Sequence, residues 1–255
     1  MESTALYDRD RMSRRSRSSL GRPLVMRQTW SAIVWCHWPV APELLAGRFP
    51  AGVRPDLFEG SAWVGLVPFE MRNLHPVVAG RSLPAVPTTR EFSEVNVRTY
   101  VTGPRGPGVW FDTLDASSRL GSLVARSAWS LPYVPARIRA DASDGPTPRA
   151  WSVERSDGTT AQVAVRAGAV ITDHTDLDRF LTDRYALYAR AWWWPGRTLW
   201  APVAHLPWTL RVCDDIEVDA SLVRAAGYPV PDNPAHVRAG DAADVEVGLP
   251  ELIRR

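Results

Sequence analysis

The chain has 255 residues, of which 45% are hydrophobic, and its formal net charge is +2. All thirty basic side chains are arginines, so a Schiff-base mechanism is excluded because no arginine can replace an amine nucleophile. Acidic and basic residues are interleaved through the folded part, a pattern that argues against nucleic-acid and membrane-surface partners.

The two cysteines and the N-terminal segment indicate where the protein is found. Cys36 and Cys213 are far apart and lack a CxxC partner, so we expect no disulfide scaffold. The basic start lacks the apolar stretch of a secretory signal, and no apolar run of about 18 residues follows it. We therefore expect a reduced, cytoplasmic chain without a transmembrane helix.

The first 27 residues differ in composition from the rest of the chain. They are rich in arginine and serine and hold few large apolar groups, which cannot offset the entropy lost on ordering. We predict a disordered tail over residues 1–27, or a start assigned too early, followed by a single domain over residues 28–255.

After the tail, short β-favouring runs alternate with turns rich in Gly and Pro. Strands are predicted over residues 29–38, 62–71, 92–102, 109–114, 136–142, 149–155, 160–166, 186–193 and 198–205, with hairpin turns at 145–148 and 157–158. Helices are predicted over residues 43–48, 116–129, 176–182 and 220–226. This pattern predicts an α+β fold, mostly antiparallel β with a few covering helices.

The predicted strand 92–102 has one polar and one apolar face. Glu94, Asn96, Arg98 and Tyr100 alternate with valines, so these four side chains share a face. If the apolar face packs under helices, the polar row points into a cavity, where Arg98 with a nearby carboxylate could grip an anionic ligand. A solvent-facing row and an internal salt bridge remain alternatives.

The segment after the strand 109–114 opens a predicted helix. Asp115 is well placed as an N-cap, because its carboxylate can accept the unpaired amide hydrogens of the first turn. Arg119 and Arg126 then fall on one helical face and could lean towards the cavity mouth as ligand-binding residues. Solvated arginines are the alternative, since arginine side chains usually lie at the surface.

Histidines and a tyrosine supply further candidates. Tyr185 and His205 could line the opposite wall of the cavity, and a paired His37 and His205 would provide acid–base capacity near neutral pH. A histidine satisfied within the core or at its rim is the alternative for each. His174 and His236 are expected in loops without ligand-like spacing, so we predict neither a metal site nor a cofactor.

The tryptophans divide into two groups. Most lie in or beside predicted strands and are expected to fill the core, each with a partner for its indole N–H: Trp30, Trp35, Trp38, Trp63, Trp110 and Trp208. Trp192, Trp193 and Trp194 are consecutive, so on a strand they point to alternating faces. At least one must then be exposed or contact a ligand or a partner; a homo-oligomer contact and a lid remain equally open.

Many short segments, in consistent order over residues 28–231, resemble the YqjF-like family of conserved bacterial proteins. They are HWPV (37–40), PELL (42–45), AWVGLVPF (62–69), EVNVRTYV (94–101), GVWF (108–111), LPY (131–133), FLTDRY (180–185) and HLPW (205–208). The resemblance weakens after residue 231, and residues 236–247 depart from the usual ending of the family.

That family is similar to the acetoacetate decarboxylase-like fold, which implies a β-barrel-like α+β domain around a cavity. The resemblance places Tyr133 at the position of the decarboxylase's activated Schiff-base lysine. This chain therefore lacks the amine on which that enzyme depends. A tyrosine hydroxyl there could still donate a hydrogen bond or a proton to a ligand carbonyl.

These observations give two hypotheses. The first is a small-molecule-binding domain for an anionic or carbonyl-bearing ligand, which as an enzyme would be a lyase or isomerase using Tyr133 and Glu94 or a histidine for proton transfer. The second is a non-catalytic structural or protein-interaction domain whose cavity is filled by its own side chains.

Overall fold

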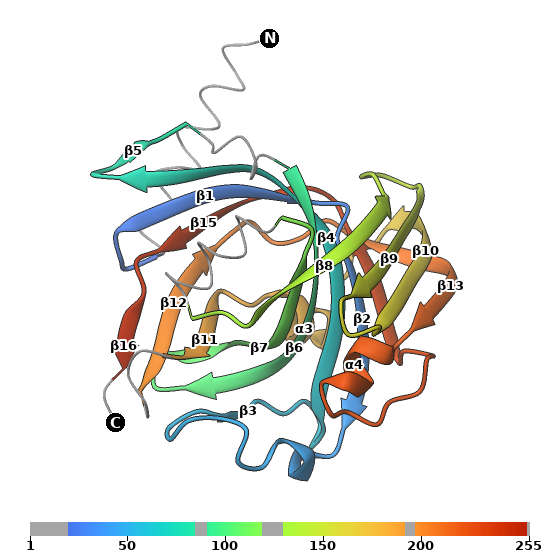
Figure 1. Ribbon diagram of the computed structural model, residues 1–255, viewed down its shortest axis with the longest axis horizontal. Helices are drawn as coiled ribbons and strands as arrows, with labels where there is room; N and C mark the ends of the chain where they lie inside the picture. The colour runs from blue at the N-terminus through green and yellow to red at the C-terminus, as the bar shows by residue number, and fades with distance from the viewer. Residues whose placement is uncertain (1–19, 85–90, 119–129, 192–196, 254–255) are drawn as a thin grey trace.

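The computed structural model describes residues 20–84, 91–118, 130–191 and 197–253 (Figure 1). Most of these residues belong to a mixed, 16-stranded sheet. Its strands are β1 (Leu24–Ser31), β2 (Val34–Val40), β3 (Arg54–Pro55), β4 (Ala62–Val78), β5 (Arg81–Ser82), β6 (Glu91–Gly103), β7 (Gly106–Ala116), β8 (Tyr133–Asp141), β9 (Pro148–Arg155), β10 (Thr160–Val170), β11 (Ala186–Arg190), β12 (Thr198–Ala204), β13 (Leu210–Asp219), β14 (His236–Gly240), β15 (Ala243–Gly248) and β16 (Glu251–Ile253).

The strand pairings close into two ring-like circuits that share β4, β6 and β7 (Figure 1). One circuit continues from β7 through β11, β12, β15 and β1 back to β4. The other continues from β7 through β8, β9, β10, β13, β14 and β2 back to β4. Only the pairings of β7 with β8 and β11 are parallel among those described, which confirms the mostly antiparallel α+β prediction.

The shared strands separate two apolar cores because their side chains alternate between two faces. The first core receives side chains such as Phe69 of β4 and Tyr100 of β6. The second core receives Leu66 of β4 together with Val95 and Val97 of β6. The valine face of β6 therefore belongs to the same core as buried side chains of β9 and β10.

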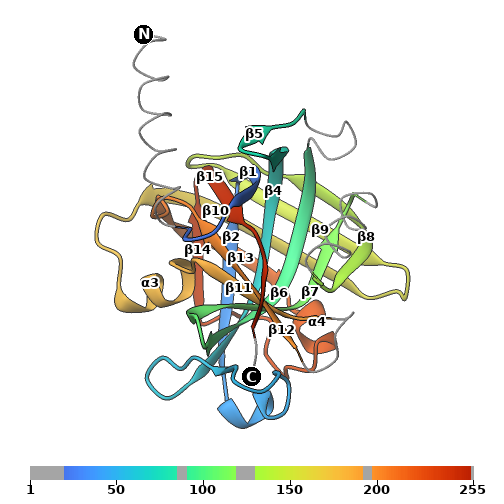
Figure 2. The ribbon, with the colours of Figure 1, turned by 90° about the vertical axis from the view of Figure 1, so that its left-hand side faces the viewer.

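Helices are short and lie outside the sheet. Helix α3 (Asp176–Thr182) matches its predicted bounds and lies beside β14 (Figure 2). Helix α4 (Ser221–Ala225) packs two apolar side chains into the second core. The predicted helix 43–48 is instead a single 3-10 turn, η1 (Pro42–Leu45). Of the predicted helix 116–129, residue 116 ends β7 and residues 119–129 lie outside the described part.

Two differences from the predicted strands concern the ends of the folded chain. The predicted strand 29–38 is two strands, because Ala32 adopts a positive φ of 52° and turns the backbone between β1 and β2. β1 begins at Leu24, four residues before the predicted domain boundary, while residues 1–19 of the predicted tail lie outside the described residues. Strands β13 to β16 were not predicted at all.

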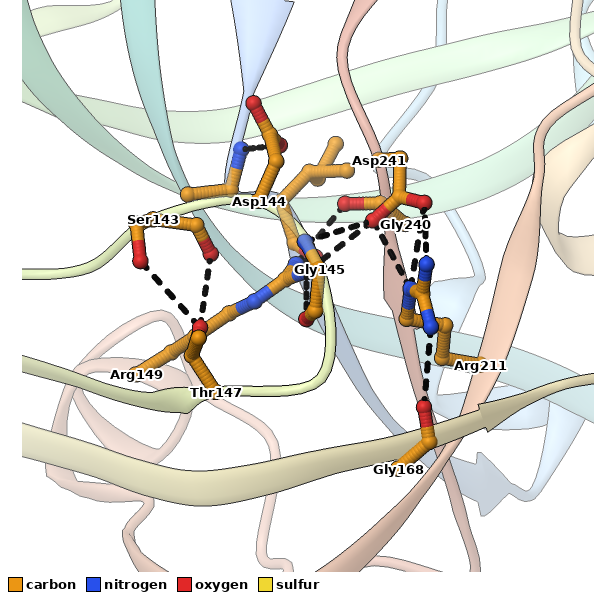
Figure 3. Close-up of polar contacts among 11 residues, drawn as sticks. Ser143, Asp144, Gly145, Thr147, Arg149, Gly168, Arg211, Gly240 and Asp241 are labelled. Carbon is orange, nitrogen blue, oxygen red and sulfur yellow. Dashed lines mark hydrogen bonds and ion pairs between the residues drawn. The ribbon is translucent and has the colours of Figure 1, made fainter.

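A buried arginine cluster ties β9 to the start of β2 and the end of β14 (Figure 3). Arg149 is fully buried, and its Nη1 donates to the carbonyl oxygens of Ile33 at 3.0 Å and Gly240 at 2.7 Å. Its Nη2 donates to the Gly145 carbonyl at 3.2 Å and lies 3.4 Å from Asp241, whose carboxylate also pairs with Arg211 in this cluster. The guanidinium thus satisfies acceptors from three separate chain segments.

Candidate functional site

Glu94 and Tyr133 meet inside the molecule. Glu94 lies on β6 and Tyr133 begins β8, which pairs with β7 beside it. The Tyr133 hydroxyl donates to Glu94 Oε2 at 2.9 Å, and both side chains are buried. The structure therefore brings together the two residues that the sequence suggested for proton transfer.

Burial controls the acidity of both groups. Loss of hydration raises the pKa of Glu94 to about 7, although hydrogen bonds from Tyr133 and Asn96 oppose the shift. Burial and the neighbouring Glu94 carboxylate together raise the pKa of Tyr133 well above its usual value. At neutral pH the pair therefore combines a carboxyl that can gain or lose a proton with a phenol that remains a donor.

Arg98 lies on the same face of β6 and is deeply buried. Its side chain is 7% exposed, beside Glu94 at 2% and Asn96 at 3%, so the polar row does not face solvent. Arg98 Nε donates to the Tyr100 hydroxyl oxygen and Nη2 to the Leu181 carbonyl, both at 3.3 Å. Within the described residues it forms no ion pair, so the internal salt bridge that the sequence left open is not seen there.

Other buried polar atoms on this side of β6 also lack partners. Asn96 Oδ1 has no hydrogen-bond donor, and this side holds three of the four buried indole N–H groups that have no acceptor among the described residues: those of Trp30, Trp35 and Trp63. All three indoles belong to the first core or pack against it. The tryptophans are thus in or against the core as predicted, but these three lack the predicted partner. Buried polar groups are nearly always paired in proteins, so this part of the interior has unused hydrogen-bonding capacity.

A chain of hydrogen bonds begins at Tyr100 and runs towards α3. The Tyr100 hydroxyl lies 2.6 Å from His37 Nε2, and His37 Nδ1 lies 3.1 Å from His236 Nδ1. His236 Nε2 lies 2.8 Å from Asp178 Oδ1. We call these four residues the relay chain. Gly65 makes room for it, because a Cβ at that position would lie 2.8 Å from the His37 ring.

The carboxylate end fixes the direction of every hydrogen bond in the relay chain. Burial opposes ionisation of Asp178, but hydrogen bonds from His236 and Thr175 and the charge of Arg238 hold its pKa well below the usual value. An ionised carboxylate only accepts, so His236 carries its proton on Nε2 and accepts at Nδ1. His37 must then donate from Nδ1 and accept at Nε2 from Tyr100.

Both imidazoles of the relay chain are neutral at pH 7. Burial is the main cause of a His37 pKa well below 6.5, and the charges of Arg98 and Arg238 add to it. Burial also lowers the pKa of His236, although its hydrogen bond to Asp178 opposes the shift. The phenol and the two imidazoles therefore rest uncharged near two arginines, and the ionised Asp178 carboxylate ends the chain.

The outer end of the relay chain opens to a surface groove of about 650 Å³. His236 and Arg238 of β14 line this groove together with Thr175 and Asp176 at the start of α3. Neither this groove nor another of about 630 Å³ near η1 is lined by any of the predicted site residues. The relay chain thus joins the interior of the first core to one particular face of the molecule.

The remaining predicted residues are placed differently. The rings of Tyr185 and His205 contact each other at a tilt, with centroids 4.8 Å apart, and His205 contacts Trp208 of the first core. The predicted pairing of His37 with His205 is wrong, because His37 pairs with His236. Arg119, Arg126 and the tryptophans at 192–194 lie outside the described residues.

Two sequence expectations are corrected by the position of the side chains. Asp115 is not an N-cap: it lies within β7 and accepts two 2.6 Å hydrogen bonds from Arg155. His236 is not in a loop, because it begins β14, where it and Arg238 alternate with apolar residues. That alternation over residues 236–240 was the signal that could have identified the strand.

No group of three or more His, Cys, Asp or Glu side chains is arranged to hold a metal ion in the described part of the chain. No helix among the described residues is long and apolar enough to cross a membrane.

Comparisons with known proteins agree with the fold. The model of the DUF2071 family, described as "Uncharacterized conserved protein", matches residues 27–242. The "Uncharacterized protein YqjF" of Bacillus subtilis (strain 168) is 34% identical over 213 residues, which are 82% of this chain and 84% of that protein.

Solved structures extend the comparison to enzymes at low sequence identity. An acetoacetate decarboxylase-like enzyme from Sphingomonas wittichii RW1 superposes with a TM-score of 0.62 at 12% identity, covering 91% of this chain and 93% of that one. The enduracididine biosynthesis enzyme MppR complexed with pyruvate gives a TM-score of 0.60 at 12% identity, covering 90% of each chain. The fold is therefore acetoacetate decarboxylase-like.

Proposed function

The chain belongs to the DUF2071 family and has an acetoacetate decarboxylase-like fold, and from this premise we propose that it binds a small anionic, carbonyl-bearing ligand beside Arg98. The observation that carries the proposal is a buried guanidinium with no ion-pair partner in the described residues. Burying an unpaired charge costs several kcal/mol of lost hydration. An anion bound at the guanidinium would offset a cost of this order. An anionic ligand would supply the missing charge.

The unpaired polar atoms support a ligand with both donors and acceptors. Asn96 lies between Glu94 and Arg98 on β6, and its Oδ1 is free to accept from a ligand hydroxyl. A strand rises about 3.3 Å per residue, so the backbones of Glu94 and Arg98 are roughly 13 Å apart. A ligand that reaches both would place its anionic group at Arg98 and its reacting carbon towards Glu94.

The chemistry we propose is proton transfer at a carbon next to the ligand's carbonyl, as in a lyase or isomerase. Glu94 has a pKa of about 7 and can remove such a proton near neutral pH, while Tyr133 donates a hydrogen bond. The absence of lysine rules out an imine intermediate, so the carbonyl must be polarised by hydrogen bonds and charge alone. The pyruvate complex of MppR, a protein of the same fold, is compatible with a ligand of this class.

Native mass spectrometry after incubation with fractionated metabolite extract tests the binding step. We expect a retained small-molecule mass in the wild type and its loss in Arg98→Gln. The matched control is Arg137→Gln, which removes a largely exposed arginine and should retain the ligand. Retention in Arg98→Gln contradicts the anchor, and no retained mass in the wild type favours a filled interior and a non-catalytic interaction domain.

Turnover of the captured ligand tests the chemical step. Glu94→Gln and Tyr133→Phe should each lower the rate by about 100-fold, the low end of what a positioned proton-transfer group contributes. Unchanged turnover in both variants would show that this pair takes no part in the reaction.

A further inference from the structure

The relay chain forms a second set of proton-transfer groups on the first core, separate from Glu94 and Tyr133. We propose that Tyr100 is a phenol activated by His37, His236 and Asp178, and that its oxygen removes a proton from a carbonyl-bearing anion held at Arg98. The identity of that ligand rests on the function proposed above. The activation of Tyr100 rests on the relay chain alone.

The resting hydrogen bonds already point in the direction that activation requires. Tyr100 gives its proton to His37 Nε2 at 2.6 Å, so a lone pair of its oxygen is directed elsewhere. Arg98 Nε approaches that oxygen at 3.3 Å, which places Tyr100 one hydrogen bond from the proposed anchor. This arrangement resembles a hydroxyl paired with an imidazole base whose orientation is set by a carboxylate.

The proton path is complete within four residues. As the Tyr100 oxygen takes a proton from the ligand, its own O–H bond breaks and an N–H bond forms on His37 Nε2. The Nδ1 proton of His37 passes to His236 Nδ1, and the imidazolium that forms is paired with the Asp178 carboxylate, which stays ionised. His236 lines the groove and releases a proton there to water. No atom changes oxidation state, and the ligand is left with one proton fewer.

Two imidazoles rather than one keep positive charge out of the interior. The groups that face them are Tyr100 and Arg98 from β6, Arg238 from β14 and Asp178 from α3. From β4 the facing residue is Gly65, which carries no charge. An imidazolium on His37 would lie near two guanidinium groups, so passing the proton on to His236, beside the Asp178 carboxylate, avoids that position.

Tyrosines elsewhere in the fold provide a contrast. Tyr188 is as fully buried as Tyr100, but its hydroxyl donates to the Gly106 carbonyl at 2.9 Å and accepts from the Arg105 amide. A backbone carbonyl cannot take a proton at neutral pH, so Tyr188 has no base. Burial raises the pKa of both phenols, so at rest neither is a phenolate. Of these two tyrosines, only Tyr100 has an imidazole that can take its proton as it reacts.

Labelling with methanesulfonyl fluoride tests this difference without a known substrate. The Tyr100 oxygen forms an O–S bond as the S–F bond breaks, fluoride leaves, and the hydroxyl proton enters the relay chain. Peptide mapping of the whole protein at pH 7 should find Tyr100 labelled faster than Tyr188. His37→Gln and His236→Gln should each slow labelling of Tyr100 by about 100-fold, as expected for loss of a general base.

The control variant is His75→Gln, which removes a histidine outside the relay chain that contacts the Leu83 carbonyl. It should label Tyr100 like the wild type, and Tyr133 should react equally in all variants. An unlabelled Tyr100 in the wild type, or labelling that does not depend on His37 and His236, overturns the proposal.

Nitrogen-15 spectra of labelled histidines provide a measurement on the unchanged protein. The relay chain predicts the Nδ1–H form of His37 and the Nε2–H form of His236 at pH 7. The opposite tautomer on either ring, or an imidazolium, overturns the proposal even if a variant fails to fold. The uncharged label does not need Arg98 as an anchor, so histidine-dependent labelling without ligand capture would remove the proposed ligand and leave the activated Tyr100 in place.

Discussion

Two buried arginines on opposite cores show how this fold separates stability from function. Arg149 is surrounded by acceptors: three carbonyl oxygens and the Asp241 carboxylate receive its hydrogen atoms (Figure 3). Arg98 has only one hydroxyl and one carbonyl oxygen among the described residues, and no carboxylate. Arg149 thus has acceptors for both terminal nitrogens, including a carboxylate, although its buried Nε has none, whereas Arg98 has no carboxylate partner in the described part of the chain.

The difference indicates where the protein has kept an unfavourable arrangement. Natural proteins rarely bury a charge without a partner, because the lost hydration is not returned. Where such a charge persists beside an elevated carboxyl pKa and unpaired polar atoms, a functional site is the usual explanation. The comparison therefore supports our proposal that Arg98 serves a ligand, whereas the partners of Arg149 lie within the fold.

Replacing Arg149 should have the largest effect on stability. Arg149→Met leaves buried carbonyl oxygens without donors and Asp241 with one cation fewer, so we expect the free energy of unfolding to fall by about 4 kcal/mol. Urea denaturation measures the change, with the exposed Arg137→Met as the control. A loss no greater than the control's would show that the cluster in Figure 3 is not what holds β9 to β14.

Glu94 should make the protein less stable as the pH rises. Its pKa is about 7 when folded and about 4.5 when unfolded, so between these values the native state binds more protons than the unfolded state. Stability contributed by the protonated carboxyl is therefore present at pH 4.5 and lost by pH 7, a change of about 3 kcal/mol.

The variant Glu94→Gln isolates this contribution from other carboxyls. Glu70 and Asp112 also have raised pKa values through burial, so the wild type alone does not report Glu94. The difference in unfolding free energy between wild type and Glu94→Gln should change between pH 5 and 8 and then level off. A difference that stays constant over this range would mean that Glu94 titrates normally and is not poised for proton transfer.

The same comparison shows what could be inferred from the sequence. The polar row on β6 was predictable because alternation assigns Glu94, Asn96 and Arg98 to one face, whichever strand lies beside it. The resemblance to the YqjF-like family added Tyr133, which no local pattern marks as a partner of Glu94. Helix α3 was predicted with its bounds because Thr175 and Asp178 form a capping box around its first turn.

Long-range pairing explains what was missed. The relay chain joins His37, Asp178 and His236, which are more than 50 residues apart in sequence, and nothing local to any of them indicates the others. His236 was expected in a loop, but it lies on β14, which gains its hydrogen bonds from β2, far away in the sequence. Asp115 was read as a cap because its partner Arg155 lies two strands away.

Replacing Arg98 is expected to have the smallest effect on stability. This replacement tests the central claim, that the charge of Arg98 serves a ligand and not the fold. The measurement is urea unfolding of ligand-free wild type and Arg98→Met. Replacing a buried charge that lacks a partner by a side chain of similar length should leave the free energy of unfolding within about 1 kcal/mol of the wild type, or increase it. A loss of about 3 kcal/mol or more, as for a buried arginine whose partners are within the protein, would contradict the account.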